Sequence, residues 1–351
     1  MEPSPSTSSA FEEFVELCEK EGLLQRPNGL APEDTIDGIN DTTTLKRFFV
    51  ARNSDPAAAL QQFKQSFEAR KQVHDISTYE NIDADIYERT RKIYPHWTGR
   101  RSKRGLPICV YTVSALDQAT LTEYDKTGEM PHVDSTSLTT EPNQAQRAFA
   151  FHDTLMRFIL PLCSAMRDRP SPETPISAAI IVVDVAAFGL KQAWNVRSYA
   201  QNISRILATS YPEVLDTVYV ANAPFYFSKL WSIVKVFIDP RTTEKLVILT
   251  QAETLPVLSE VIEVESIPVQ CGGTFEYEPG MRPSLDEGMQ RQLQWIAEPG
   301  ESLPPGPLKW IVDEEGRRTA VVTGSANGER VRLPFARLEE KKDSRVATPL
   351  P

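Results

Sequence analysis

The chain has 351 residues, of which 40% are hydrophobic and 25% charged, and its formal net charge is −10. This composition is that of a globular protein rather than a fibrous or wholly disordered one, and the length is enough for two or three folding units. A net acidic chain is a poor match to a general nucleic-acid binder, because affinity for the phosphate backbone needs a basic surface.

The cysteine pattern and the termini narrow the class further. No two of the cysteines have the spacing of zinc ligands or of a redox pair, so we expect reduced, buried thiols, no disulfide framework and no metal. The first residues lack the basic and apolar regions of a secretory signal, and no apolar run approaches the ~18 residues that span a bilayer. The sequence predicts a cytoplasmic protein without a cofactor.

Two helical units are expected before residue 96. Residues 1–41 are predicted to be a flexible N-terminus with a short helix that opens at a capping box of Ser9 and Glu12. Residues 42–95 are predicted to be a helical module, in which Asp55-Pro56 supplies the cap and first-turn proline of one helix.

An α/β domain is predicted over residues 96–275. Apolar runs typical of strands alternate with helical patterns, which indicates βαβ units and a mostly parallel sheet. The expected strands are 106–113, 176–185, 217–222, 245–249 and 267–269, and the expected helices are 143–168, 192–210, 228–237 and 252–263.

Residues 276–351 differ in composition and are predicted to form a C-terminal extension. The segment 309–323 indicates a hairpin that turns at Glu315-Gly316, and the following sequence RVRLPF indicates a further strand. We therefore expect a small β-rich unit at this end of the chain.

No catalytic motif is found. The nucleophile elbow, the phosphate-binding loop and the dinucleotide-binding glycine pattern are all lacking in the sequence, and the histidines are scattered. We expect no enzyme and name no catalytic residues.

A basic stretch, ERTRKIYPHWTGRRSKRG, precedes the first predicted strand of the α/β domain. It has two interpretations, a solvated loop or a site that docks on anionic membranes, where each basic residue adds ~1 kcal/mol. Docking would use Arg100, Arg101, Lys103 and Arg104. Vesicle co-sedimentation that did not respond to anionic lipid or to salt would exclude it.

The segment from Phe225 to Ile238 is the most informative one, because ten of its fourteen residues are apolar or aromatic. Such a helix is either a buried core helix or one in contact with lipid. Asp239-Pro240 then opens a second helix that carries Thr242 and Lys245 on one face. A hydroxyl, an ammonium and free amide groups suit a phosphate ester, although an ordinary capped surface helix fits as well.

These motifs resemble the CRAL-TRIO lipid-binding domain, in its phosphatidylinositol-transfer branch. The resemblance covers about residues 42–275. It rests on these residues: Leu45, Arg47, Phe48, Phe49, Ala51, Arg52, Val183, Asp184, Tyr211, Pro212, Glu213, Asn222, Ala223, Pro224, Phe225, Phe227, Phe237, Asp239, Pro240, Thr242, Lys245, Gly272 and Gly273.

The resemblance implies a helical module followed by an α/β lobe with a sheet floor, a hydrophobic cavity and a gating helix. It places the lipid headgroup at Arg52, Glu213, Thr242 and Lys245. It places the gate and the cavity at Phe225, Phe227, Leu230, Trp231, Val234, Phe237, Ala179, Ile181 and Cys109.

The sequence departs from the family pattern at two places. Val50 and Asn53 stand where the family often has basic residues, which should weaken phosphate binding. Ala179 and Ile181 replace two hydroxyls that hold phosphatidylcholine, and Cys109 replaces a pocket tyrosine. An unpaired choline phosphate costs several kcal/mol to bury, so phosphatidylcholine is predicted to be a poor second ligand and a sterol a better one.

The resulting hypothesis is a cytosolic protein that binds one phospholipid, phosphatidylinositol first, and exchanges or presents it during transient contact with anionic membranes. Two alternatives stay open. One is a carrier of another hydrophobic ligand, such as a sterol, with a weakened headgroup site. The other is a lipid-stabilised adaptor that binds a protein partner through its C-terminal tail.

Overall fold

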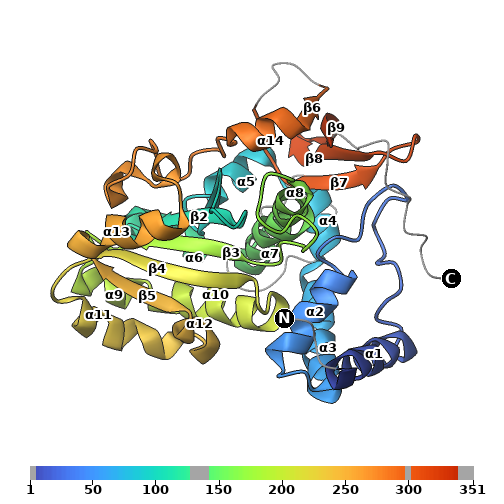
Figure 1. Ribbon diagram of the computed structural model, residues 1–351, viewed down its shortest axis with the longest axis horizontal. Coiled ribbons are helices and arrows are strands. Elements are labelled where there is room, and N and C mark those ends of the chain that lie inside the picture. The colour runs from blue at the N-terminus through green and yellow to red at the C-terminus, as the bar shows by residue number, and fades with distance from the viewer. Residues whose placement is uncertain (1–4, 127–141, 297–301, 339–351) are drawn as a thin grey trace.

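A computed structural model describes residues 5–126, 142–296 and 302–338. A five-stranded sheet in the order β1-β2-β3-β4-β5 forms its centre, in which β1 is antiparallel to β2 and the other neighbours are parallel (Figure 1). The strands are β1 (His96–Arg101), β2 (Pro107–Thr112), β3 (Ala179–Asp184), β4 (Leu215–Ala223) and β5 (Leu246–Thr250). The predicted α/β class with a mostly parallel sheet is confirmed.

The crossover helices follow the predicted order but are divided more finely. They are η1 (Val113–Ala115), α6 (Gln118–Lys126), α7 (Gln144–Thr154), the π-turn η2 (Leu155–Ile159), α8 (Leu160–Ala165), α9 (Leu190–Asn195), α10 (Arg197–Ser210), α11 (Phe227–Val234), the 3₁₀ turn η3 (Lys235–Phe237), α12 (Pro240–Glu244) and α13 (Gln251–Val261). The single helix expected over 143–168 passes through η2 just before Pro161, which has no amide hydrogen for the helical ladder.

The two faces of the sheet pack against different layers. One face carries Ile108, Val110, Ile180 and Val182 into a large core that also contains side chains of η2, α8 and α13. The opposite face contributes to a second core with side chains of α9, α10 and α11. Alternation along each strand divides the apolar residues between these two cores, which explains the continuous apolar runs of the sequence.

The N-terminal helices are α1 (Pro5–Lys20), α2 (Thr42–Ala51), α3 (Pro56–Val73), α4 (Asp75–Asn81) and α5 (Ala84–Thr90). Phenylalanine rings of α1, α2 and α3 pack together, with Phe48 and Phe63 centroids 5.0 Å apart. Asp55 accepts a hydrogen bond from the Ala58 amide, so the predicted cap is confirmed. The first helix begins at Pro5, before the expected capping box, and residues 1–4 of the predicted flexible N-terminus lie outside the described residues.

The C-terminal extension forms a second, antiparallel sheet in the order β6-β9-β8-β7. Its elements are α14 (Glu287–Gln292), β6 (Leu293–Trp295), β7 (Leu308–Val312), β8 (Arg318–Ala326) and β9 (Glu329–Leu338). The predicted hairpin and the following strand are confirmed. Trp310 and Phe335 are buried in the same core as β2 and β3, so the extension shares the core of the α/β domain.

The strand expected at 267–269 is wrong. Two 3₁₀ turns, η4 (Val264–Ser266) and η5 (Val269–Cys271), flank Pro268, which makes one isolated bridge to Phe275. Proline cannot donate to a β-ladder, so the apolar segment turns instead of extending.

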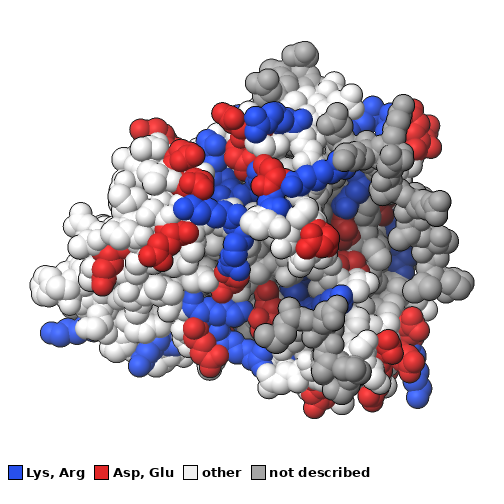
Figure 2. Space-filling model, viewed as in Figure 1, with Lys and Arg blue, Asp and Glu red and all other residues white. Residues whose placement is uncertain are grey.

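Strand β1 was not anticipated, because its sequence is rich in basic residues. The extension crosses it, with the Ser284 and Asp286 amides donating to the Thr98 and Gly99 carbonyls. Gly99 has φ +87°, and a Cβ there would lie 2.4 Å from the Ser284 backbone, so this crossing requires glycine. Figure 2 shows basic and acidic side chains interspersed across the middle of this side of the molecule.

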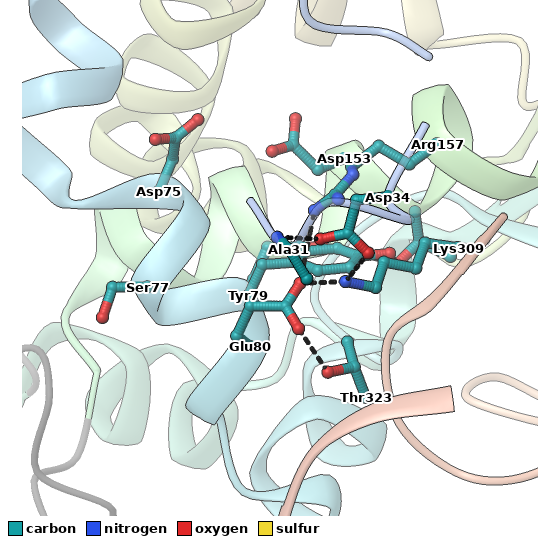
Figure 3. A network of polar contacts seen from close by, with 12 residues as sticks. Ala31, Asp34, Asp75, Ser77, Tyr79, Glu80, Asp153, Arg157, Lys309 and Thr323 are labelled. Atoms are coloured by element: carbon teal, nitrogen blue, oxygen red, sulfur yellow. Dashed lines mark hydrogen bonds and ion pairs between the residues drawn. The ribbon is translucent and has the colours of Figure 1, made fainter. Parts of the chain in front are cut away.

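A buried ion cluster joins the extension to the N-terminal part of the chain (Figure 3). The Lys309 ammonium on β7 lies 2.7 Å from Asp34 Oδ1 and 2.6 Å from Glu80 Oε1. The side chains of Lys309 and Asp34 are 1% and 0% exposed. Arg332 of β9 is a second partner of Asp34 at 2.8 Å, and the Thr323 hydroxyl donates to Glu80 at 2.7 Å. The cluster links the loop before α2, helix α4 and the C-terminal sheet.

Replacement of Lys309 by alanine is expected to lower the free energy of unfolding by ~3–5 kcal/mol, because two buried carboxylates lose their shared cation. Urea denaturation measures this effect. Arg317→Ala is the control, since it removes a pair with Asp313 in which the arginine is 39% exposed, worth at most about 1 kcal/mol. Equal losses of unfolding free energy for the two substitutions would contradict the assignment of Lys309 as the shared buried cation of Asp34 and Glu80.

Candidate lipid-headgroup and acyl-chain site

A polar pocket of about 300 Å³ lies between the end of α2, the loop after α10 and helix α12. Its lining includes Arg52, Glu213, Thr242 and Lys245, the residues at which the sequence predicted the headgroup site. They come from segments far apart in the chain, so only the tertiary fold brings them together.

Local structure fixes the two walls of this pocket. On one wall the Asp239 carboxylate caps α12 by accepting from the Arg241 amide, as predicted from Asp239-Pro240. On the other wall Glu213 has φ +55°, in the left-handed region, within the loop that joins α10 to β4. Holding a non-glycine residue in this conformation requires a well-packed surrounding, which points to a fixed orientation of the Glu213 carboxylate.

The support for this loop is a buried network beneath it. Tyr211 donates to Asp153 Oδ1 at 2.7 Å, and Arg70 contacts both Asp153 oxygens at 2.8 and 3.0 Å. Arg70 also pairs with Asp75 at 2.7 Å. Burial raises the pKa of Tyr211 well above its usual range, so the hydroxyl stays protonated and keeps donating.

Within the pocket the charged groups are engaged to different degrees. Lys245 Nζ lies 2.7 Å from Glu213 Oε2 and 2.7 Å from the Leu215 carbonyl, which leaves one of its three donors. The guanidinium of Arg52 and the hydroxyl of Thr242 have no partner among the residues that the structure describes. The pocket therefore presents free donors, as the binding of a phosphate requires.

Two polar residues of the lining, Arg241 and Gln62, were not named from the sequence. Arg241 of α12 lies 3.5 Å from Glu213 Oε1 and 3.2 Å from Asn53 Oδ1. Gln62 of α3 is buried, with Nε2 donating to the Ala208 carbonyl at 2.8 Å and Oε1 without a partner. Arg241 directly precedes Thr242, and that position next to a predicted site residue could have indicated it. Gln62 gave no signal in the sequence, since it lies in an ordinary helical pattern.

An apolar cavity of about 200 Å³ adjoins the polar pocket on the second-core side of the sheet. Thr242 lines both spaces. The walls of the cavity are the apolar faces of β2, β3 and β4 together with α10 and α11, and Phe227 and Trp231 are the gate residues that reach it. Their rings stack with centroids 6.4 Å apart.

The other residues predicted for the gate lie elsewhere. Leu230 is fully buried in the second core, Phe237 is half-buried, and Phe225 is 97% exposed ahead of the helix. Val234 ends α11, and its side chain lies outside the described part of the chain. The polar residues of the segment, Ser228, Lys229, Ser232 and Lys235, are exposed, so the helix is amphipathic rather than apolar all round.

The structure does not bring Cys109, Ala179 and Ile181 to the cavity. They lie in or against the first core, whereas Tyr111 and Val183, further along the same strands, line the cavity. The cavity is therefore nearer the carboxyl ends of the strands than the sequence suggested.

The basic side chains at β1 make internal contacts. Arg101 pairs with Asp168 and Asp286, each at 2.6 Å, and Arg104 pairs with Asp216 at 2.5 Å. Lys103 donates to the Ser259 carbonyl at 2.8 Å, and the Arg100 guanidinium lies over the Phe275 ring. Membrane docking through these residues stays a prediction.

No cluster of three or more histidine, cysteine, aspartate or glutamate residues in the described ranges could hold a metal ion. No described helix is long and apolar enough to cross a membrane.

Comparison with known proteins agrees with this arrangement. The CRAL/TRIO domain model matches residues 96–273. The SEC14 cytosolic factor of Eremothecium gossypii is 28% identical over 275 residues, which cover 76% of this chain and 82% of that protein. The phosphatidylinositol/phosphatidylcholine transfer protein SFH11 of Arabidopsis thaliana is 26% identical over 78% of this chain and 64% of its own length.

Among solved structures, the crystal structure of Sfh5 matches with a TM-score of 0.50 and 13% identity. The match covers 83% of this chain and 96% of that one, so the fold extends beyond the residues of the family model.

Proposed function

Because the chain belongs to the CRAL/TRIO domain family, we propose that it binds one phospholipid, phosphatidylinositol, and exchanges it between membranes. Relatives named as phosphatidylinositol/phosphatidylcholine transfer proteins support lipid binding and transfer. The protein acts as a carrier, and none of its residues is assigned a catalytic role.

The observation that carries this proposal is the junction at Thr242. A pocket with three basic side chains meets an apolar cavity at this residue, as the headgroup and acyl chains of a phospholipid require. Arg52 and Lys245 neutralise the phosphate, Thr242 donates to it, and Glu213 orients Lys245 or accepts from the inositol hydroxyls.

Acyl chains supply most of the binding free energy, at ~0.8 kcal/mol for each buried CH₂ group, and the polar pocket supplies selectivity. The apolar cavity, at about 200 Å³, is smaller than the ~300–1,000 Å³ of typical ligand sites. Two acyl chains therefore enter only when α11 moves away from the sheet. Helix α11 is the gate in this proposal.

The membrane contact that opens the gate is proposed to lie on α11 and its neighbours. Phe225, Val236 and Trp194 are 97%, 69% and 60% exposed there. Lys229 and Lys235 are exposed beside them. Aromatic and basic side chains together favour an anionic lipid surface. The protein works from the cytoplasm and contacts membranes transiently; two relatives bear the name cytosolic factor.

The first test is mass spectrometry of the lipid retained after exposure to a mixed membrane extract, with wild type and Lys245→Ala compared. Wild type should retain phosphatidylinositol in near-stoichiometric amount. The variant should retain about tenfold less, because a charge-assisted contact to the phosphate is lost. Lys20→Ala, which removes an exposed lysine on α1, is the control. A sterol or another neutral lipid in the wild type would favour the alternative carrier.

Phosphatidylcholine is expected to be taken up at least about tenfold less than phosphatidylinositol, since the cavity walls are apolar apart from the hydroxyls of Tyr111, Tyr199 and Thr242 and carry no cation for a second phosphate site. Competition between fluorescently labelled forms of the two lipids, matched in acyl chains, measures the ratio. Equal uptake would refute this expectation.

The double variant Phe225→Ser, Val236→Ser should lower co-sedimentation with anionic vesicles by more than about tenfold, because two exposed apolar side chains are removed. The matched pair Arg100→Ala, Arg104→Ala tests the docking site predicted at β1 and should have a smaller effect, since Arg100 lies over Phe275 and Arg104 pairs with Asp216. A loss of co-sedimentation in the arginine pair, but not in the Phe225, Val236 variant, would place docking at the basic cluster of β1.

A further inference from the structure

Arg241 of the polar pocket is held less firmly by its neighbours than Lys245. Its side chain is 41% exposed, and its nearest carboxylate oxygen is 3.5 Å away. Its other contact is a hydrogen bond of 3.2 Å to Asn53 Oδ1, a neutral acceptor on an exposed residue. Such contacts contribute little, so a phosphate can displace them at low cost.

Lys245 presents the opposite case. Two of its three donors are used at 2.7 Å, on Glu213 and on the Leu215 carbonyl, so the ammonium fixes Glu213 and has one donor left for a phosphate. A guanidinium has five donors in a planar fork that matches two phosphate oxygens. Arg241 therefore has more unused hydrogen-bonding capacity than Lys245.

The charge balance of the pocket points the same way. Its lining has three cations, Arg52, Arg241 and Lys245, and two carboxylates, Glu213 and Asp239. The excess of one positive charge equals the single negative charge of a phosphodiester. Without Arg241, the pocket would be neutral before the ligand bound and negative afterwards.

Position completes the argument. Arg241 is in the first turn of α12, next to Thr242, and its side chain reaches Asn53 at the turn that follows α2. Asn53 and Ser54 have φ values of +55° and +63°, so this turn is sharp and brings the end of α2 to the rim of the pocket. Arg241 thus contacts Asn53, which follows Arg52, and Glu213, which pairs with Lys245, so its guanidinium can reach a phosphate that Arg52 and Lys245 approach.

We propose that Arg241 binds the headgroup phosphodiester directly and releases Asn53 and Glu213 when the lipid enters. Its guanidinium then supplies the positive charge that the neutral Asn53 does not provide. The inference rests on the proposed phosphatidylinositol binding and adds a ligand-contacting residue to it. Asn53 then acts as the resting partner of Arg241 in the empty pocket.

The test measures extraction of phosphatidylinositol from phosphatidylcholine vesicles by wild type, Arg241→Ala and the double variant Arg241→Ala, Asn53→Lys. Arg241→Ala should weaken extraction about tenfold and make it less sensitive to salt, with an unchanged melting temperature. The lysine at position 53 returns a cation to the same place, so the double variant should regain most of the loss. Arg282→Ala, an exposed arginine of the extension, is the control.

The outcomes separate the two levels of the proposal. A wild-type chain that extracts no phosphatidylinositol overturns the proposed function and this inference with it. Wild-type extraction that Arg241→Ala leaves unchanged overturns only the role of Arg241. A loss with no recovery in the double variant, or with a lowered melting temperature, would mean that Arg241 holds α12 in place and does not bind phosphate.

A water-soluble competitor, glycerophosphoinositol, should reduce extraction by wild type more than inorganic phosphate does. Equal competition by the two compounds would assign Arg241 to free phosphate.

Discussion

Burial of the Lys309 ammonium between Asp34 and Glu80 is the constraint on which the arrangement of this protein depends. A charged group that is buried away from water must be paired, because burying it unpaired costs several kcal/mol. The loop before α2, helix α4 and strand β7 therefore have one acceptable relative position. The C-terminal sheet is fixed to the lipid-binding lobe by electrostatics as well as by the apolar contacts of Trp310 and Phe335. A tail that binds partners independently, as in the adaptor alternative, would not need this shared core.

Helix α4 connects this cluster to the polar pocket, although it has only seven residues. Glu80 binds Lys309, the Tyr79 hydroxyl reaches the Leu308 carbonyl, and Asp75 at the other end pairs with Arg70. Through Asp153, Arg70 positions Tyr211, two residues before Glu213. Rigid hydrogen-bonded support of this kind lets a pocket select one headgroup, since its polar atoms do not have to be ordered when the ligand arrives.

Local chemistry explains which parts of the site the sequence could predict. The Asp239 cap, and Thr242 and Lys245 after it, form a short motif whose geometry is set within one helical turn. Arg241 was not named because its contact with Asn53 joins positions 188 residues apart, which no local pattern specifies. Strand β1 was missed because the partners of Arg101 lie on distant segments. The cavity was placed too near the start of β3, since its depth depends on how α10 and α11 pack, which no local pattern specifies.

The pairing of the first and last parts of the chain has a consequence for synthesis. Thr35 bonds to the Trp310 carbonyl across 275 residues, next to the Lys309 cluster. At about 5–20 residues per second, a ribosome needs roughly 14–55 s to make the intervening chain. During that time Asp34 and Glu80 lack their lysine, and the core that receives Trp310 is open to water. The shared core is thus completed only when β7 has been made, because Lys309 and Trp310 both lie on that strand.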